Sequence, residues 1–173
     1  VHAGMHDFVK VLDFGLAKNL DRAEKTLSGV GLIVGTMDYI APECLLDPDR
    51  AGPASDQYAV GCVAYYLIMG REPFAGGGEA ATVAAHLVKQ APPMEGRAPA
   101  ELEAIVMRCL AKAPEERFAS MRQLSRALSR LSLPPWGEVE ASEWWHDHAA
   151  DVVKRAAVEP SPTSVGNVRP VSR

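Results

Sequence analysis

The chain has 173 residues, of which 47% are hydrophobic, and its 18 basic and 22 acidic side chains give a formal net charge of −4. These values suit one globular domain with a short extension. No run of five like charges occurs, so nothing favours contact with nucleic acid or an anionic membrane surface. The longest apolar stretches, such as residues 58–69, are too short to span a bilayer.

The N-terminus and the cysteines both help to predict the cellular compartment of the protein. Residues 1–6 have neither the charged start nor the apolar core of a signal peptide. Because no initiator Met is present, we expect the chain to begin inside a longer protein. Cys44, Cys62 and Cys109 are isolated, odd in number and without metal-ligand spacing. We therefore expect reduced, buried thiols in a cytoplasmic protein.

The N-terminal part of the chain is predicted to hold a short strand and a long loop. Residues 8–14 are rich in β-branched and aromatic side chains and follow a turn, which is typical of a strand. Residues 16–38 show no clean hydrophobic period and include Gly29, Gly31 and Gly35. Long irregular segments inside compact domains are usually functional or disordered.

The apolar run that begins after Ser55 predicts a central helix. Ser55 suits an N-cap, the residues up to Met69 are apolar on nearly every side, and Gly70 provides a C-terminal stop. A helix that is apolar all round belongs in a core. We therefore expect the helix from about Asp56 to Met69 to be the most buried element.

Helical spacing of apolar residues continues through most of the second half of the chain. The segment that starts at Ser120, for example, places Leu124, Leu128 and Leu131 on one face behind a capping serine. Together with proline and glycine stops, this spacing predicts helices at 79–89, 99–112, 120–131 and 138–157.

Composition also predicts where the domain ends. Pro134-Pro135 separates the last helix, which is amphipathic, from those before it. Proline, serine and valine dominate after Glu159 without a period, which is typical of a disordered segment. The predicted organisation is a domain over residues 1–133, an extra helix over 134–158 and a disordered tail over 159–173.

Five short motifs follow one another in a fixed order. Asp-Phe-Gly at 13–15 ends the predicted strand, and G-T-M-D-Y-I-A-P-E at 35–43 follows 20 residues after Gly15. D-Q-Y-A-V-G at 56–61 opens the apolar helix, G-R-E-P-F at 70–74 closes it, and P-E-E-R-F occupies 114–118. One tripeptide recurs by chance, but this order and context strongly resemble the C-terminal lobe of a protein kinase over about residues 1–133.

The resemblance implies a fold and an activity. The fold would be mainly α with a short β segment: an incomplete kinase C-terminal lobe without the N-terminal lobe or the catalytic loop. The phrase D-F-G-L-A-K at 13–18 is especially similar to serine/threonine kinases of bacteria and eukaryotes. Thr36 stands where such kinases carry a threonine near the catalytic loop. The implied cofactors are ATP and Mg²⁺, and the implied acceptors are Ser and Thr hydroxyls of protein substrates.

The resemblance also assigns roles around the nucleotide. Asp13 would supply a carboxylate to Mg²⁺, a cation that favours oxygen ligands. Phe14 would pack beneath the site, and Gly15 would let the backbone turn sharply. Residues 15–42 look like the activation segment, in which Gly35 to Ala41, including Thr36, would line the pocket beside the acceptor hydroxyl.

Three residues resemble structural positions of the family. Glu43 and Arg117 look like its buried ion pair, which joins the activation segment to the helical core. Asp56 resembles the helix acid that holds the catalytic-loop backbone, although a carboxylate in the first turn of a helix is also favoured by the helix dipole alone.

Thr26 and Ser28 lie where related kinases are phosphorylated; the alternative is that both are ordinary loop hydroxyls.

Several parts of a kinase are missing from the sequence. It contains no His-Arg-Asp and no Gly-rich ATP loop, and it offers no candidate for the family's N-terminal-lobe strand lysine or for the helix glutamate that pairs with it. Either the chain is a fragment of an active kinase, whose N-terminal half is its missing partner, or it is a truncated, non-catalytic remnant that only binds other proteins. Both hypotheses predict that the chain alone is inactive. Both also predict exposed apolar surface at 58–69, because the helix that normally covers it is missing.

Two features of the extra helix raise the question of a metal or ligand site. His146 and His148 with Asp151 suggest a metal site, but neighbouring helix positions point to different sides, so a solvated face is favoured. Trp144 and Trp145 are expected to anchor the helix onto the domain rather than to bind a ligand.

Overall fold

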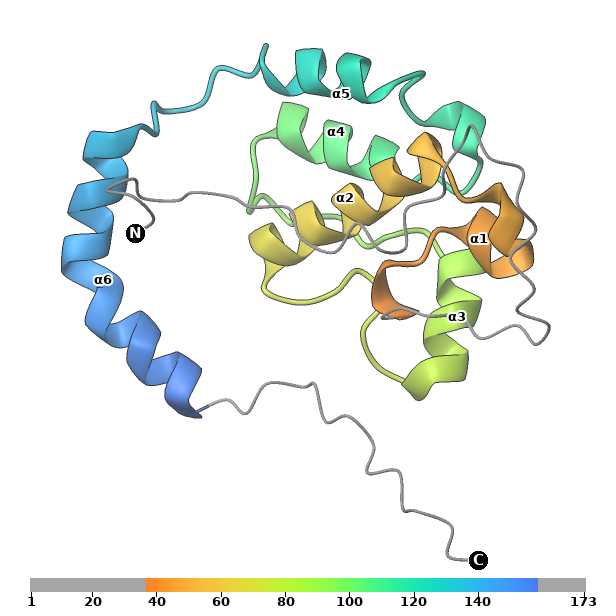
Figure 1. Ribbon diagram of the computed structural model, residues 1–173, viewed down its shortest axis with the longest axis horizontal. Helices are drawn as coiled ribbons and strands as arrows, with labels where there is room; N and C mark the ends of the chain where they lie inside the picture. The colour runs from red at the N-terminus through yellow and green to blue at the C-terminus, as the bar shows by residue number, and fades with distance from the viewer. Residues whose placement is uncertain (1–36, 159–173) are drawn as a thin grey trace, which may run out of the picture. The chain divides into compact units, whose positions relative to one another are not determined.

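The computed structural model describes residues 37–158 (Figure 1). The strand predicted at 8–14, residues 16–36 of the predicted irregular segment and the predicted tail at 159–173 lie outside the described residues. The described residues divide between residues 132 and 133 into two units.

Helices dominate the described residues, and none of these residues forms a strand. This agrees with the expected mainly α fold of an incomplete kinase lobe. The first unit contains η2 (Met37–Tyr39), α1 (Pro42–Leu46), η3 (Pro48–Arg50), α2 (Pro53–Met69), α3 (Gly78–Val88), α4 (Ala100–Cys109), η4 (Pro114–Glu116) and α5 (Met121–Leu128), and the second contains α6 (Glu138–Val158).

Helix α2 begins earlier than the sequence predicted. Pro53 takes the first helical position, which tolerates a missing N–H, and Gly52 is the N-cap. The Ser55 hydroxyl accepts a hydrogen bond from the Gly52 N–H at 2.7 Å and donates one to the Gly52 carbonyl at 2.6 Å. Ser55 was therefore wrongly predicted as the N-cap. The predicted stop is confirmed, because Gly70 ends α2 in the left-handed conformation, at φ 69°.

One side of α2 forms the centre of the first unit. Its Tyr58, Cys62 and Tyr65 are fully buried, in a cluster with residues from α4 and from the connections on either side of α3. No other described helix buries as many residues, so the prediction that α2 is the most buried element is confirmed. Gly61 lies where α2 meets α4, and a Cβ there would come within 2.8 Å of the Cys109 Cβ. This contact needs a glycine because the two helices approach so closely.

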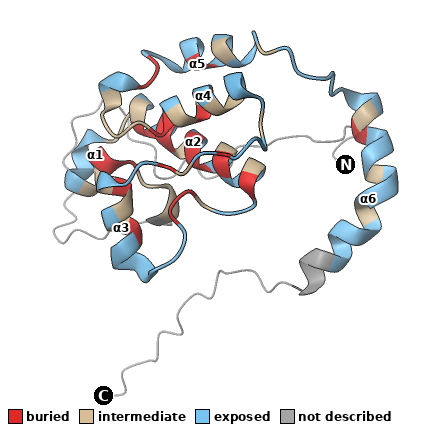
Figure 2. Ribbon diagram, turned by 180° about the vertical axis from the view of Figure 1, so that it is seen from behind, coloured by how far each residue is buried: buried red, intermediate tan, exposed pale blue. Residues whose placement is uncertain are grey.

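The opposite side of α2 is exposed, so the helix is not buried all round as its composition suggested (Figure 2). Val60, Val63 and Leu67 are 42%, 46% and 75% exposed. With Asp56 they recur at spacings of three and four, which places them along one stripe of the helix. We call these four residues the outer stripe of α2. Its exposure agrees with the expectation that apolar surface remains uncovered at 58–69.

The other helices of the first unit are arranged around α2. Figure 1 shows α4 between α2 and α5, while α3 packs against both α1 and η2. In α5, the predicted capping serine is confirmed, because the Ser120 hydroxyl accepts a hydrogen bond from the Gln123 N–H at 3.2 Å. Leu124 packs with Cys109 and Phe118 in a second, smaller core cluster.

Helix α6 has the bounds that the sequence predicted, to within one residue. Trp144 stacks on His148 with ring centroids 4.5 Å apart, and it meets Trp145 edge-on at 5.1 Å. Of the apolar side chains along one side of this amphipathic helix, Trp145 and Ala149 are half-buried, whereas Val152 is exposed.

We predict that Gly61→Ala destabilises the chain by about 1–3 kcal/mol, because the added methyl forces α2 and α4 apart in a packed core. Thermal or urea unfolding measures this loss. Gly52→Ala is the matched control, since nothing lies closer than 4.0 Å to a Cβ there. Its effect should stay below about 1 kcal/mol, the cost of replacing a glycine N-cap by alanine. Equal losses from both substitutions would contradict the close contact at Gly61.

Candidate functional site

The structure describes three of the candidate site residues: Glu43, Asp56 and Arg117. The other candidates, namely Asp13, Phe14, Gly15, Thr26, Ser28 and Thr36, lie outside the described residues. The described part of the site is therefore its structural framework and the surface around it.

Glu43 and Arg117 form a two-pronged ion pair inside the first unit. The Arg117 Nη1–H donates to Glu43 Oε1 at 2.7 Å, and Nη2–H donates to Oε2 at 2.8 Å. The two residues are 4% and 1% exposed, and they are 74 positions apart in sequence. Paired, parallel hydrogen bonds of this kind are the strongest that arginine makes with a carboxylate.

The remaining donors of Arg117 are also satisfied. Nη1 donates to the Ala54 carbonyl at 2.8 Å, Nη2 to the Lys112 carbonyl at 3.2 Å, and Nε to the Ala111 carbonyl at 2.9 Å. A guanidinium has five N–H groups, and all five have an acceptor here. The charge is thus both paired and fully hydrogen-bonded, which is the condition for burying it.

Local sequence explains how the pair meets. Pro42 opens α1 and places Glu43 in its first turn. Pro114 opens η4, and Arg117 follows as its C-cap. Gln57 of α2 then fixes the next residue, because its side-chain amide donates to the Phe118 carbonyl at 2.9 Å and accepts from the Phe118 N–H at 3.1 Å. Sequence reasoning missed Gln57, although a polar residue inside an apolar helix was a signal.

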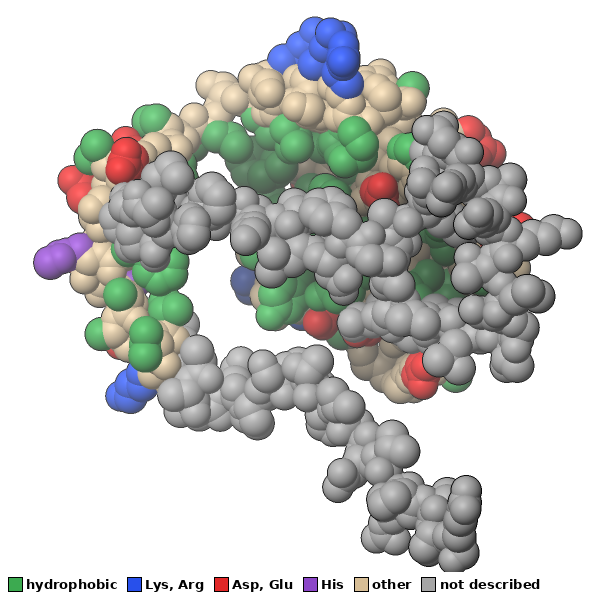
Figure 3. All heavy atoms as spheres, viewed as in Figure 1, with side chains coloured by type: hydrophobic (Ala, Val, Ile, Leu, Met, Phe, Trp, Pro, Cys, Tyr) green, Lys and Arg blue, Asp and Glu red, His purple; other side chains and the backbone are tan. Residues whose placement is uncertain are grey.

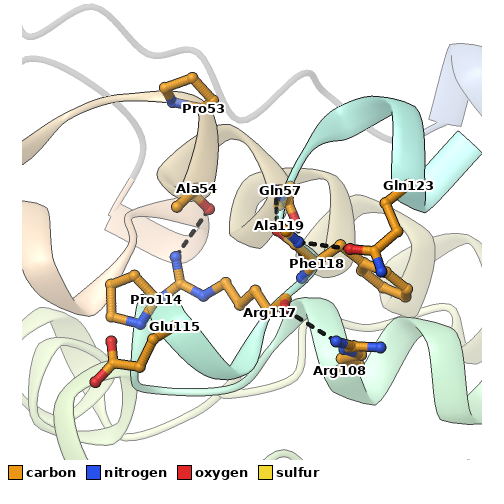
Figure 4. A pocket seen from close by; sticks show the side chains of 10 residues that line it. All are labelled: Pro53, Ala54, Gln57, Arg108, Pro114, Glu115, Arg117, Phe118, Ala119 and Gln123. Atoms are coloured by element: carbon orange, nitrogen blue, oxygen red, sulfur yellow. Dashed lines mark hydrogen bonds between the residues drawn. The ribbon is translucent and has the colours of Figure 1, made fainter.

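A pocket of about 540 Å³ opens beside this arrangement (Figure 4). Arg108 reaches across it, donating to the Arg117 carbonyl at 3.2 Å and lying 4.3 Å from the centre of the Phe118 ring. The polar side chains of its buried residues, Gln57 and Arg117, already have protein partners. The pocket therefore presents no unpaired buried donor to a ligand. Its lining comprises Pro53, Ala54, Gln57, Arg108, Pro114, Glu115, Arg117, Phe118, Ala119 and Gln123.

Asp56 lies on the opposite, exposed side of α2. Its carboxylate heads the outer stripe in the first turn of the helix and makes no hydrogen bond or ion pair within residues 37–158. Figure 3 shows hydrophobic side chains gathered around α2 and α4 on the viewed face, and basic side chains over α5. The structure thus places Asp56 away from the Glu43–Arg117 pair and at one end of an apolar row.

A second buried polar cluster went unrecognised in the sequence. The Tyr58 hydroxyl of α2 lies 2.9 Å from His86 Nδ1 of α3 and 3.3 Å from Lys112 Nζ. Burial, assisted by the Lys112 ammonium, lowers the pKa of His86 to about 4. Burial lowers the pKa of Lys112 to about 8. Nothing in the local pattern marks His86, since its partners are 28 and 26 positions away.

The structure does not support a metal site on α6. His148 Nδ1 is 2.8 Å from the Trp144 carbonyl, within its own helix. No three His, Cys, Asp or Glu side chains between residues 37 and 158 are grouped closely enough to bind a metal ion. In the same range, no helix is both long and apolar enough to cross a membrane.

Comparison with known proteins identifies the family. The protein kinase domain profile matches residues 2–128, which include every motif noted in the sequence. The chain belongs to the protein kinase family. Curated relatives are serine/threonine kinases, which confirms the resemblance and the fold class.

Two relatives illustrate the extent of the match. The serine/threonine-protein kinase Pkn1 of Myxococcus xanthus is 41% identical over 96% of this kinase chain and 24% of the relative. The serine/threonine-protein kinase PknA of Mycobacterium tuberculosis is 39% identical over 65% of the chain and 25% of the relative. The chain thus spans about a quarter of the length of the curated relatives it matches.

We predict that Arg117→Met costs about 3–5 kcal/mol of stability, because it strands the buried Glu43 carboxylate. The double variant Glu43→Met, Arg117→Met should lose clearly less than the sum of the two single losses. A double-mutant cycle from urea unfolding measures the coupling. Additive losses would contradict a direct, buried pair.

We also predict acid-induced destabilisation from His86. In the unfolded chain this histidine titrates near the ordinary pKa of 6.5, whereas the folded one stays neutral down to a pKa of about 4. Stability is therefore lost as pH falls from about 6.5 towards 4, with a slope of up to about 1.4 kcal/mol per pH unit. Between about pH 5 and 6.5 the slope should be smaller in His86→Gln. Identical slopes would show that His86 does not carry the effect.

Proposed function

We propose that the chain is the C-terminal part of a serine/threonine protein kinase domain, and that the complete enzyme transfers the γ-phosphoryl group of ATP to Ser and Thr residues of proteins. The observation that carries this proposal is the Glu43–Arg117 pair, which ties the G-T-M-D-Y-I-A-P-E segment to the helical core in a chain matched by the kinase profile over residues 2–128. Relatives with serine/threonine kinase names support the acceptor class.

The proposal gives the remaining candidates their roles. Asp13 would bind Mg²⁺, Phe14 would pack under the nucleotide and Gly15 would allow the turn between them and the activation segment. Magnesium would offset the charge of the phosphate oxygens. Because residues 37–158 offer no group of metal ligands, this role depends on Asp13 and on residues of the missing half. Thr36 would lie beside the acceptor hydroxyl.

The outer stripe of α2 is proposed as the contact for that missing half. Asp56 would hold the backbone of the catalytic loop, and Val60, Val63 and Leu67 would pack against the helix before it. The exposure of these apolar side chains supports the proposal, since large exposed patches usually mark an interaction surface. Thr26 and Ser28 remain proposed phosphorylation sites in the activation segment.

The proposed domain organisation and cellular compartment are those that the sequence predicts. Residues 1–133 would be the kinase portion, 134–158 an added helix and 159–173 a tail. Cys62 and Cys109 are buried free thiols and Cys44 is a half-buried one. This state supports a reducing, cytoplasmic location for this segment.

We predict that purified residues 1–173 transfer no phosphate, because the general base and most of the nucleotide pocket are missing from the sequence. The full-length gene product should phosphorylate a Ser- or Thr-containing protein with Mg²⁺ and ATP. Asp13→Ala in that protein should lower kcat by roughly a hundredfold or more, whereas Asp147→Ala on α6 should not. Radiolabelled phosphate transfer measures both.

Two outcomes would contradict the proposal. Phosphate transfer by residues 1–173 alone would disprove the need for the missing half. An inactive full-length product whose coding sequence lacks His-Arg-Asp and a Gly-rich loop would instead favour the alternative, a remnant that only binds other proteins.

A further inference from the structure

Helix α5 and the turn after it carry three arginines that have no acidic partner. Arg122 and Arg126 lie four positions apart on α5, and Arg130 follows where the chain still winds, because its N–H bonds to the Ala127 carbonyl at 3.3 Å. All three are exposed, and none of their guanidinium groups makes a hydrogen bond or ion pair within residues 37–158. Figure 3 shows basic side chains gathered over α5. We call these three arginines the basic stripe.

Helix α6 carries the opposite charge at the same spacing. Glu143, Asp147 and Asp151 also recur every four positions and are exposed. Their carboxylates make no hydrogen bond or ion pair in the part of the chain that the structure describes. No lysine or arginine occurs in α6 before Lys154. We call these three acids the acidic stripe.

Each stripe is electrostatically unfavourable on its own helix. Like charges four positions apart repel one another and destabilise a helix. Residues 121–132 contain no acidic side chain, so the basic stripe has no neighbour of opposite charge along its own segment. The acidic stripe likewise has no basic neighbour along α6 until Lys154. Placing the two stripes face to face would relieve the repulsion in both.

The equal spacing lets all three charges of each stripe pair at once. Residues four apart form rows inclined to the helix axis, and such rows on two helices align when the helices cross at about −50°. Three successive contacts between a guanidinium and a carboxylate can then form along one row, and the planar fork of arginine suits two oxygens of a carboxylate. Several charges in such a network are more effective than one exposed pair.

Both stripes lie away from the sides on which their helices are buried. On α5, the buried Leu124 and the half-buried Ala127 lie on a different side from the basic stripe. On α6, the buried Ala141 and the half-buried Trp145 and Ala149 lie opposite the acidic stripe, so that side is already covered within the same chain. Each stripe is therefore free to meet a second molecule.

A second copy of the chain is the partner that supplies both complements. Pro134 and Pro135 favour an extended connection between α5 and α6, which opposes the tight turn needed to lay α6 along α5 of the same chain. Two copies that exchange these helices would use each stripe twice, as a twofold-symmetric interface does.

We propose that the chain self-associates by pairing the basic stripe of one copy with the acidic stripe of a second copy. The contact is reversible and sensitive to salt, because ions screen exposed charges. This inference goes beyond the proposed kinase function and does not rest on it, since neither stripe contains a residue of the proposed active site.

Salt separates this contact from association through the outer stripe of α2. Sedimentation velocity of residues 1–173 should show a dimer at about 0.05 M NaCl, and the association constant should fall about tenfold or more at about 0.5 M NaCl. Association of apolar surfaces does not depend on the screening of charge. A chain that stays monomeric at low salt, or that associates equally at both salt concentrations, would overturn the proposal without any variant being needed.

Charge reversal then tests which residues meet. One variant reverses the basic stripe and the other reverses the acidic stripe: Arg122→Glu, Arg126→Glu, Arg130→Glu in the first, and Glu143→Lys, Asp147→Lys, Asp151→Lys in the second. Each alone should associate about tenfold or more weakly than wild type, because like charges then face each other. Mixing the two variants should restore most of the wild-type association, since one variant carries only negative stripes and the other only positive ones.

A third variant controls for net charge. Arg50→Glu, Arg71→Glu, Arg97→Glu changes the same number of charges at exposed positions outside the basic stripe, and it should associate as wild type does. Thermal unfolding checks that every variant is folded. Undiminished association of the stripe variants, or no recovery on mixing folded ones, would show the proposal to be wrong. If a chain with both reversals regains thermal stability while no sample associates, the two stripes pair within one chain and the second copy is excluded.

Discussion

The fold of the first unit depends on one buried positive charge, the Arg117 guanidinium, whose hydrogen bonds must all be made to protein acceptors. The five donors of Arg117 end on Glu43 in α1, on Ala54 in α2, and on the two residues that follow α4 and its C-cap. A buried guanidinium that lost any of these acceptors would carry an uncompensated desolvation cost. Each element is therefore held at the position where its acceptor meets the same side chain, and the segment ending at Glu43 cannot move independently of the core.

Tyr58 connects this ion pair to the rest of the unit. Its ring centre lies 5.0 Å from the Arg117 guanidinium carbon, and its hydroxyl meets His86 and Lys112. The aromatic face stabilises a cation while the hydroxyl satisfies two polar groups, so one residue of α2 serves both buried clusters. Any rearrangement of α3 is thereby coupled to the same helix that fixes Arg117.

Sequence reasoning succeeded where a pattern is local or tied to a family motif. Gly70, Ser120 and the bounds of α6 follow from capping and periodicity, and the Glu43–Arg117 pair follows from the resemblance. It failed where the outcome depends on distant partners. Ser55 was mistaken for the N-cap because serine favours that position. Periodicity does not weigh the better start that Gly52 and Pro53 offer before it. His86 was invisible because its role depends on Tyr58 and Lys112, which only the tertiary fold brings to it.

The outer stripe of α2 shows why composition alone misjudged burial, and it also restricts what can cover it. The run is apolar on all sides, but Val60, Val63 and Leu67 have no covering element within residues 37–158. A second copy of the chain is poorly suited to this surface: antiparallel pairing would set the Asp56 carboxylate against leucine, and parallel pairing would set two carboxylates together. A cover that brings backbone N–H groups to Asp56 and apolar side chains to the rest avoids both costs. The proposed catalytic loop and the helix before it have this chemistry, so the exposed stripe favours a kinase fragment over a self-sufficient domain.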